Sequence, residues 1–168
     1  MGSAGKQVIV DRRGRATGDR QIAADDRGGV GARRDVVRQG RDFAILAVGT
    51  MVNQALAAAE LLAADGVDVS VVNCRYMKPY DEVTLNAILA SHTHVLTVEE
   101  GTIVNGFGSF ISSVIHRQAP TVRTAVHGVP DRIIYSAPRK KQLAALGLDP
   151  AGIADRVRAM HDSEALAS

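Results

Sequence analysis

At 168 residues, with 46% hydrophobic residues and a formal net charge of +2, the chain is long enough to form one globular domain with a substantial core. Its single cysteine, Cys74, excludes an intramolecular disulfide, and no apolar run approaches the roughly 20 residues of a transmembrane helix. We therefore expect a cytoplasmic protein that has no membrane partner.

The N-terminal part of the chain is basic and poor in large apolar residues. Residues 1–41 carry ten Lys and Arg against five Asp and Glu, and they contain no Phe, Tyr or Trp. Such a segment cannot bury enough apolar surface to offset its loss of entropy on ordering, so we predict that residues 1–40 are disordered. A nucleic-acid contact through Arg12–Arg15 is the less favoured interpretation, because no aromatic residues are interleaved to stack on bases.

From residue 41 onward the pattern becomes that of a folded domain. Short apolar runs predict strands at residues 43–48, 67–72, 94–98 and 121–126. Helical spacing and capping residues predict helices at residues 52–62, 81–90, 108–117 and 139–146, and a last one from Pro150. This alternation predicts an α/β fold of three layers, a mostly parallel sheet with helices on both faces. We expect the domain to cover residues 41–161 and residues 162–168 to be a flexible tail.

Five strings, taken in order, carry a resemblance to a known family. They are Asp42–Met51, Asn73–Asp81, Val98–Ser109, Gly128–Arg132 and Leu146–Asp149. Together they resemble the transketolase C-terminal domain family, and they are most similar to that domain in the 1-deoxy-D-xylulose-5-phosphate synthases.

The resemblance implies a thiamine-diphosphate enzyme. Members of the synthase family join pyruvate, with loss of carbon dioxide, to glyceraldehyde 3-phosphate, and so supply isoprenoid precursors. In the family, thiamine diphosphate and Mg²⁺ are bound by two upstream domains, so we expect no cofactor, no metal and no catalytic residue on this chain. The expected role is assembly or dimerisation, with a second copy or a chain that carries the thiamine-diphosphate-binding domains as partner.

Two adjacent carboxylates, Glu99 and Glu100, follow the strand predicted at residues 94–98. Neighbouring carboxylates can split their pKa values and act as general acid and base. Adjacent residues of an extended strand point to opposite faces, however, and so do not converge on one ligand. A subunit contact or the anchoring of a helix is therefore the favoured interpretation.

A glycine-bearing turn then leads into the next helix through Gly106, Phe107, Gly108 and Ser109. Backbone amides at a helix start, assisted by Ser109, can hold an anion. The favoured alternative is that the glycines supply a positive φ and a close approach of helix and strand, while Phe107 fills the core or an interface. We expect Phe107 and the surface around Glu99 to lie at a subunit interface.

Arg75 and Lys78 follow a strand where open sheets bind ligands, so they are candidates for gripping a phosphate. A salt bridge to a carboxylate is the favoured alternative. His92 and His94 are close in sequence, but no motif supplies the third ligand that a metal site needs.

Three functions are consistent with the sequence. The favoured one is a domain of a larger transketolase-type enzyme. The alternatives are a stand-alone module that binds a phosphate-bearing ligand and a nucleic-acid binder with a basic tail.

Overall fold

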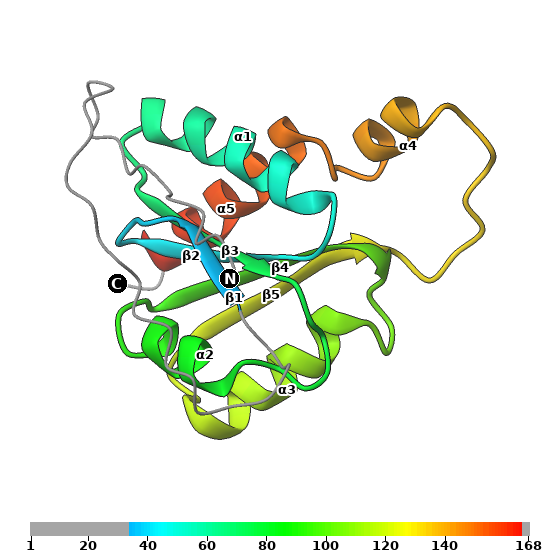
Figure 1. Ribbon diagram of the computed structural model, residues 1–168. Helices are drawn as coiled ribbons and strands as arrows, with labels where there is room; N and C mark the ends of the chain where they lie inside the picture. The colour runs from blue at the N-terminus through cyan, green and yellow to red at the C-terminus, as the bar shows by residue number, and fades with distance from the viewer. Residues whose placement is uncertain (1–33, 166–168) are drawn as a thin grey trace, which may run out of the picture. The chain divides into compact units, whose positions relative to one another are not determined.

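The computed structural model describes residues 34–165, and Figure 1 shows their arrangement. The strands are β1 (Arg34–Arg38), β2 (Phe43–Ala47), β3 (Val69–Cys74), β4 (His94–Thr102) and β5 (Arg123–Val129). The helices are α1 (Met51–Ala64), α2 (Glu82–Leu89), α3 (Phe107–Gln118), α4 (Arg139–Ala145) and α5 (Pro150–Ala165). Every strand and helix predicted after residue 41 is therefore present.

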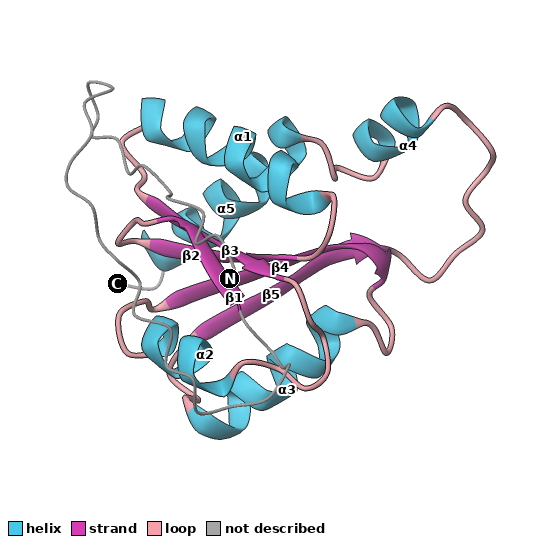
Figure 2. Cartoon of the chain, viewed as in Figure 1, coloured by secondary structure: helices cyan, strands magenta, loops and turns pink. Residues whose placement is uncertain are grey.

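The strands form one sheet in the order β1-β3-β2-β4-β5. Strand β2 pairs in parallel with β3 and β4, and β4 pairs in parallel with β5, whereas β1 runs antiparallel to β3. Helices α1 and α5 cover one face of the sheet and α2 and α3 cover the other (Figure 2). The predicted three-layer, mostly parallel α/β fold is confirmed.

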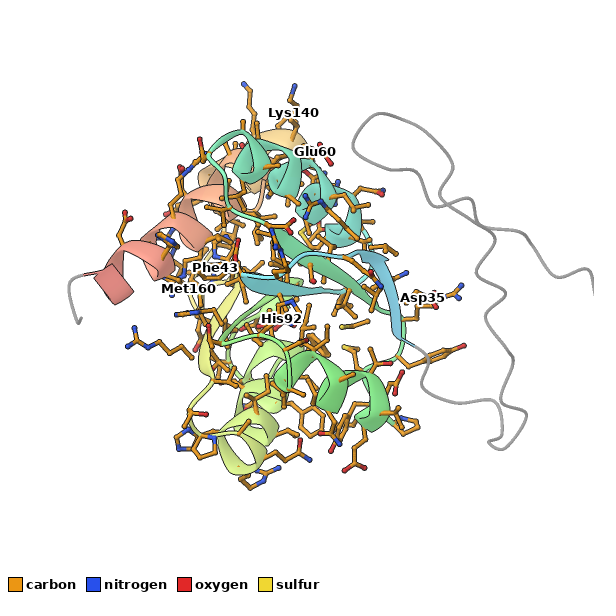
Figure 3. The ribbon with its side chains drawn as sticks, turned by 90° about the vertical axis from the view of Figure 1, so that its left-hand side faces the viewer. Asp35, Phe43, Glu60, His92, Lys140 and Met160 are labelled. Carbon is orange, nitrogen blue, oxygen red and sulfur yellow. The ribbon has the colours of Figure 1, made fainter. Side chains whose placement is uncertain are left out.

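Strand β2 shows why a continuous apolar run predicts a strand that is covered on both faces. Phe43 and Ile45 belong to the core cluster under α1 and α5, whereas Ala44 and Leu46 belong to the cluster under α2 and α3. Every residue of the strand is buried. Phe43 lies beside Met160 of α5 in Figure 3, so the last helix completes the core on that face.

The helix ends follow their predicted signals. The carboxylate of Asp81 accepts a hydrogen bond from the amide of Thr84 at 3.0 Å and so caps α2. Gly66 follows α1 with φ of +84°, the left-handed conformation that commonly ends a helix. Within the described residues no helix is long and apolar enough to cross a membrane.

Two predicted boundaries are corrected. Strand β1 falls inside residues 1–40, which were predicted to be disordered, because pairing with β3 orders it despite its charges. The rest of that prediction, for residues 1–33, lies outside the described residues. At the other end α5 continues to Ala165, into the predicted tail 162–168, since Glu164 and Ala165 favour helix; residues 166–168 lie outside the description.

Candidate functional site

The two carboxylates at the end of β4 point to opposite faces of the sheet, as their adjacency predicts. Glu99 is 6% exposed, and its side-chain oxygens accept hydrogen bonds from the amides of Phe107 at 3.0 Å and Gly108 at 2.7 Å. These amides are the first donors of α3, which have no partner within the helix. Glu99 therefore anchors the start of α3, and it shares no ligand position with Glu100.

The glycines before and within α3 are required by close packing. A Cβ on Gly106 would lie 2.1 Å from the carbonyl oxygen of Thr102, and one on Gly108 would lie 2.4 Å from Oγ1 of Thr97. The predicted positive φ is wrong for Gly106, whose φ is −81°. Asn105 adopts the left-handed conformation instead, with φ of 57°. Asparagine tolerates that region better than most side chains, and its place before Gly106 is the sequence signal for this turn.

The first turn of α3 leaves little for an anion to bind. Glu99 already occupies the two amides, and the hydroxyl of Ser109 donates to the carbonyl of Gly106 at 3.0 Å. Phe107 is 3% exposed and packs in the core under α2 and α3. The expectation that its side chain lies at a subunit interface is wrong, because a buried ring has no surface to offer a partner.

Glu100 lies at the centre of a polar cluster with Thr50 and Arg139. No pattern in the sequence had indicated that these two residues contact it. Nε and Nη2 of Arg139 donate to the two carboxylate oxygens of Glu100 at 2.8 and 2.6 Å. The hydroxyl of Thr50 donates to Glu100 at 2.8 Å and accepts from Arg139 at 2.9 Å. Hydrogen bonding from Arg139 holds the pKa of Glu100 below its ordinary value. The cluster ties the start of α4 to the ends of β4 and β2.

Arg75 and Lys78 both have partners within the chain. Nη1 of Arg75 lies 3.3 Å from Oδ2 of Asp35 on β1, so the predicted salt bridge to a carboxylate is confirmed. The ammonium of Lys78 lies 5.0 Å from the centre of the Phe110 ring, a cation–π contact that holds the loop after β3 against α3. The two side chains therefore contact different partners, and they do not point toward a common site at which a phosphate could bind.

The histidines lie in separate environments. His92 is buried, with Nε2 2.9 Å from the hydroxyl of Ser70, and the ring of His94 packs on Phe43 with centroids 4.7 Å apart. Among residues 34–165 no three His, Cys, Asp or Glu side chains are grouped so that they could hold a metal ion.

His127 joins β5 to the turn between α4 and α5. Its Nε2 lies 2.7 Å from the carbonyl oxygen of Gly147, so this nitrogen carries the donated proton in the neutral ring. Burial lowers the pKa of His127 below its ordinary value of 6.5, although the bond to Gly147 acts in the opposite direction.

The lowered pKa of His127 predicts the direction of a pH dependence. The folded state binds fewer protons at His127 than the unfolded state does, so this contribution to stability is complete above about pH 6.5 and is lost as the pH falls through the lower pKa of the folded state. His127→Gln keeps a donor for Gly147 but does not titrate. Urea denaturation from pH 7.5 to 5 should show a smaller loss of stability in the variant. Equal losses in both proteins would contradict the assignment.

Strands β2, β3, β4 and β5 end at the same edge of the sheet. We call this edge the carboxyl edge, and it includes the loops that follow the four strands: 48–50, 75–81, 103–106 and 130–138. Five of the eight exposed large hydrophobic residues among those described lie in these loops. They are Tyr76, Met77, Val104, Ile133 and Tyr135. Ile133 and Tyr135 are 84% and 85% exposed, and their loop, between β5 and α4, extends away from the sheet in Figure 1. The start of this loop lies in the string Gly128–Arg132 noted in the sequence, but no pattern there singled out Ile133 or Tyr135.

Comparison with known proteins gives a consistent family. The family described as "Transketolase, C-terminal domain" matches residues 32–153. The 1-deoxy-D-xylulose-5-phosphate synthase of Geobacillus sp. (strain WCH70) is 44% identical over 128 residues, and that of Bordetella petrii is 41% identical over 133 residues. These alignments cover 74% and 79% of the chain but 20% of each relative, so the chain spans about a fifth of their length.

Solved structures agree with the family match. A chain titled "Split gene transketolase, inactive beta4 tetramer" superimposes with a TM-score of 0.71 and 31% identity, covering 76% of this chain and 41% of that one. A transketolase mutant from Pichia stipitis superimposes with a TM-score of 0.59 at 19% identity over 75% of this chain and 17% of that one, a likeness of fold alone.

Proposed function

Because this chain belongs to the transketolase C-terminal domain family, we propose that it is the assembly domain of an enzyme of the 1-deoxy-D-xylulose-5-phosphate synthase kind. In this proposal the chain docks through its carboxyl edge onto domains that bind thiamine diphosphate and Mg²⁺. Those domains carry out the transfer of a two-carbon unit from pyruvate to glyceraldehyde 3-phosphate. The chain itself supplies no catalytic group.

The observation that carries the proposal is the gathering of exposed apolar side chains at the carboxyl edge. Such side chains scattered singly need no explanation, but a concentration in the loops at one edge of the sheet marks a surface that contacts another protein. Tyr76 and Met77 are about half exposed, and Ile133 and Tyr135 are almost fully exposed. A partner domain that covers these loops would remove this apolar surface from water.

The polar residues of the same edge support docking rather than chemistry. The Glu100 carboxylate is satisfied by Arg139 and Thr50, and the amides beside Glu99 are satisfied by Glu99 itself. Arg139 begins α4 immediately after loop 130–138, so its bidentate contact fixes one end of the exposed loop. Nε2 of Gln142 donates to the carbonyl of Tyr135 at 3.0 Å and holds the same loop against α4. A loop held in this way loses less entropy on binding.

The solved relative supports the idea that such a domain can lie on one polypeptide of a divided enzyme; the matched region is 41% of that chain, so the domain is joined there to further residues. That relative is a split-gene transketolase in the form of an inactive beta4 tetramer. By analogy, we propose that this chain joins either a second copy or a chain that carries the thiamine-diphosphate-binding domains, and that only the second assembly is active.

The test is recovery of a partner from the native cells by the tagged chain, read by mass spectrometry. We expect a protein with thiamine-diphosphate-binding domains to be recovered, and Tyr135→Asp to reduce its recovery by about tenfold, because an exposed aromatic anchor at an interface is lost. Val83→Asp is the matched control, since Val83 is 81% exposed but lies on α2, outside the loops of the carboxyl edge.

Two outcomes would contradict the proposal. One is equal recovery of the partner by the Tyr135→Asp chain and the Val83→Asp chain. The other is synthesis of deoxyxylulose phosphate by the purified chain alone, supplied with pyruvate, glyceraldehyde 3-phosphate, thiamine diphosphate and Mg²⁺.

A further inference from the structure

Strand β5 is the last strand of the sheet, and its outer edge has no paired strand among the described residues. The amide of Arg123 donates to the carbonyl of Thr93 at 2.9 Å, so Arg123 directs its backbone groups toward β4. Backbone groups alternate in direction along a strand, and those of Thr124, Val126 and Gly128 therefore point outward. These three residues present a row of donors and acceptors along the free edge.

The opposite edge of the sheet is protected in ways that β5 lacks. Strand β1 carries Arg34, Asp35 and Arg38 within five residues, and its register with β3 shifts between Val36 and Arg38. Asp35 is exposed at this edge in Figure 3. Charged residues and irregular pairing are the usual means by which proteins prevent another strand from adding to a sheet. Strand β5 contains one formally charged residue, Arg123, at its first position, and no proline.

Burial along β5 also differs from that of its neighbour. The first six residues of β4 are buried, but none of the residues of β5 is, although most of them are apolar or small. The apolar members Ala125, Val126 and Val129 all keep surface in contact with water. A strand of this composition that is only half covered is typical of one that pairs with another chain.

We propose that β5 pairs with β5 of a second copy of this chain, antiparallel across a two-fold axis at Val126, to form one continuous sheet. This inference does not depend on docking through the carboxyl edge. A second copy is the occupant that the sequence of the strand favours, because β5 is complementary to itself. In this register Val126 faces Val126, and Thr124 and Gly128 face each other on both sides of the axis. All three pairs join outward-pointing residues, so each pair exchanges two backbone hydrogen bonds.

The same register is also electrostatically favourable. Arg123 faces Val129 of the second copy, so the two arginines lie at opposite ends of the paired strands and do not meet. Asp131 follows two residues after Val129, which brings an acidic residue of each copy near the Arg123 end of the other strand. A shift of the register away from Val126 would reduce the number of paired outward residues.

The first experiment measures the mass of the full chain by sedimentation equilibrium, together with variants at the two-fold axis. We expect a species of twice the 17.8 kDa chain mass. Val126→Lys and Val126→Glu should each weaken self-association by about tenfold, because each places like charges directly opposite one another. An equimolar mixture of the two variants should recover the dimer. Val83→Lys, at an exposed position on α2, is the control that should leave the mass unchanged.

A second measurement needs no substitution and therefore does not depend on the folding of a variant. Amide hydrogen exchange is followed at concentrations above and below the dissociation midpoint. The amides of Thr124, Val126 and Gly128 should exchange at least about tenfold more slowly in the dimer, whereas that of Ala125 is bonded to β4 in both states and should change little. A chain that stays monomeric at about 200 µM, or a dimer in which these three amides exchange as fast as in the monomer, would overturn the proposal.

Discussion

Replacing Glu99 with alanine is expected to lower the free energy of unfolding by about 3 kcal/mol, because two buried amides lose a charged acceptor. These are the amides of Phe107 and Gly108, both in residues that are almost completely buried. Alanine leaves them without a partner at the N-terminus of α3, where the helix dipole also favours a negative charge. Urea denaturation at pH 7, followed by circular dichroism, measures the difference.

The adjacent residue provides the matched control for this prediction. Glu100→Ala removes a carboxylate of the same size one position along the chain, but its contacts with Arg139 and Thr50 are exposed to solvent. We expect a loss under about 1 kcal/mol. If the two alanine variants unfold at the same urea concentration, Glu99 does not anchor α3.

Gly106→Ala is the second change with a large expected effect. The added methyl group would lie 2.1 Å from the Thr102 carbonyl and 2.7 and 2.8 Å from the two carboxylate oxygens of Glu99, so the turn or the helix has to move. We expect a loss of about 3 kcal/mol from overpacking and from the disturbed hydrogen bonds of Glu99. The midpoint of thermal unfolding would fall correspondingly.

Gly49→Ala separates this steric effect from the conformational freedom of glycine. Gly49 has φ of +59°, and no heavy atom lies within 4 Å of the position that an added methyl group would take, whereas Gly106 has an ordinary φ and no free space. We expect Gly49→Ala to cost about 1 kcal/mol from the left-handed conformation alone. A larger loss at Gly49 than at Gly106 would contradict the packing argument.

The central strands and the helices could be predicted because their signals are local. The run Phe43–Val48 is apolar throughout, Asp81 caps α2, and Pro150 begins α5, and each of these signals acts within a few residues of its position.

The missed features depend on partners that are distant in the sequence. Strand β1 reads Arg-Asp-Val-Val-Arg, which has no long apolar run, and it is ordered by its pairing with β3. The contact between Glu100 and Arg139 spans 39 residues and follows from the parallel topology, because loops after neighbouring strands meet at one edge. The prediction that Phe107 lies at a subunit interface failed for the same reason. Its ring is buried by the packing of α3 against the sheet, and no local sequence pattern reports that packing.

The direction of β1 determines where the polypeptide enters the domain. Arg34 pairs with Cys74, the last residue of β3, so the chain enters the sheet at the carboxyl edge. A polypeptide joined before Arg34 therefore starts beside the surface that we propose for docking, and a short connection would hold it there at a high effective concentration. Covalent fusion and non-covalent association would then produce the same geometry. A gene for such an enzyme could be divided or joined at this point without rebuilding the contact between its parts.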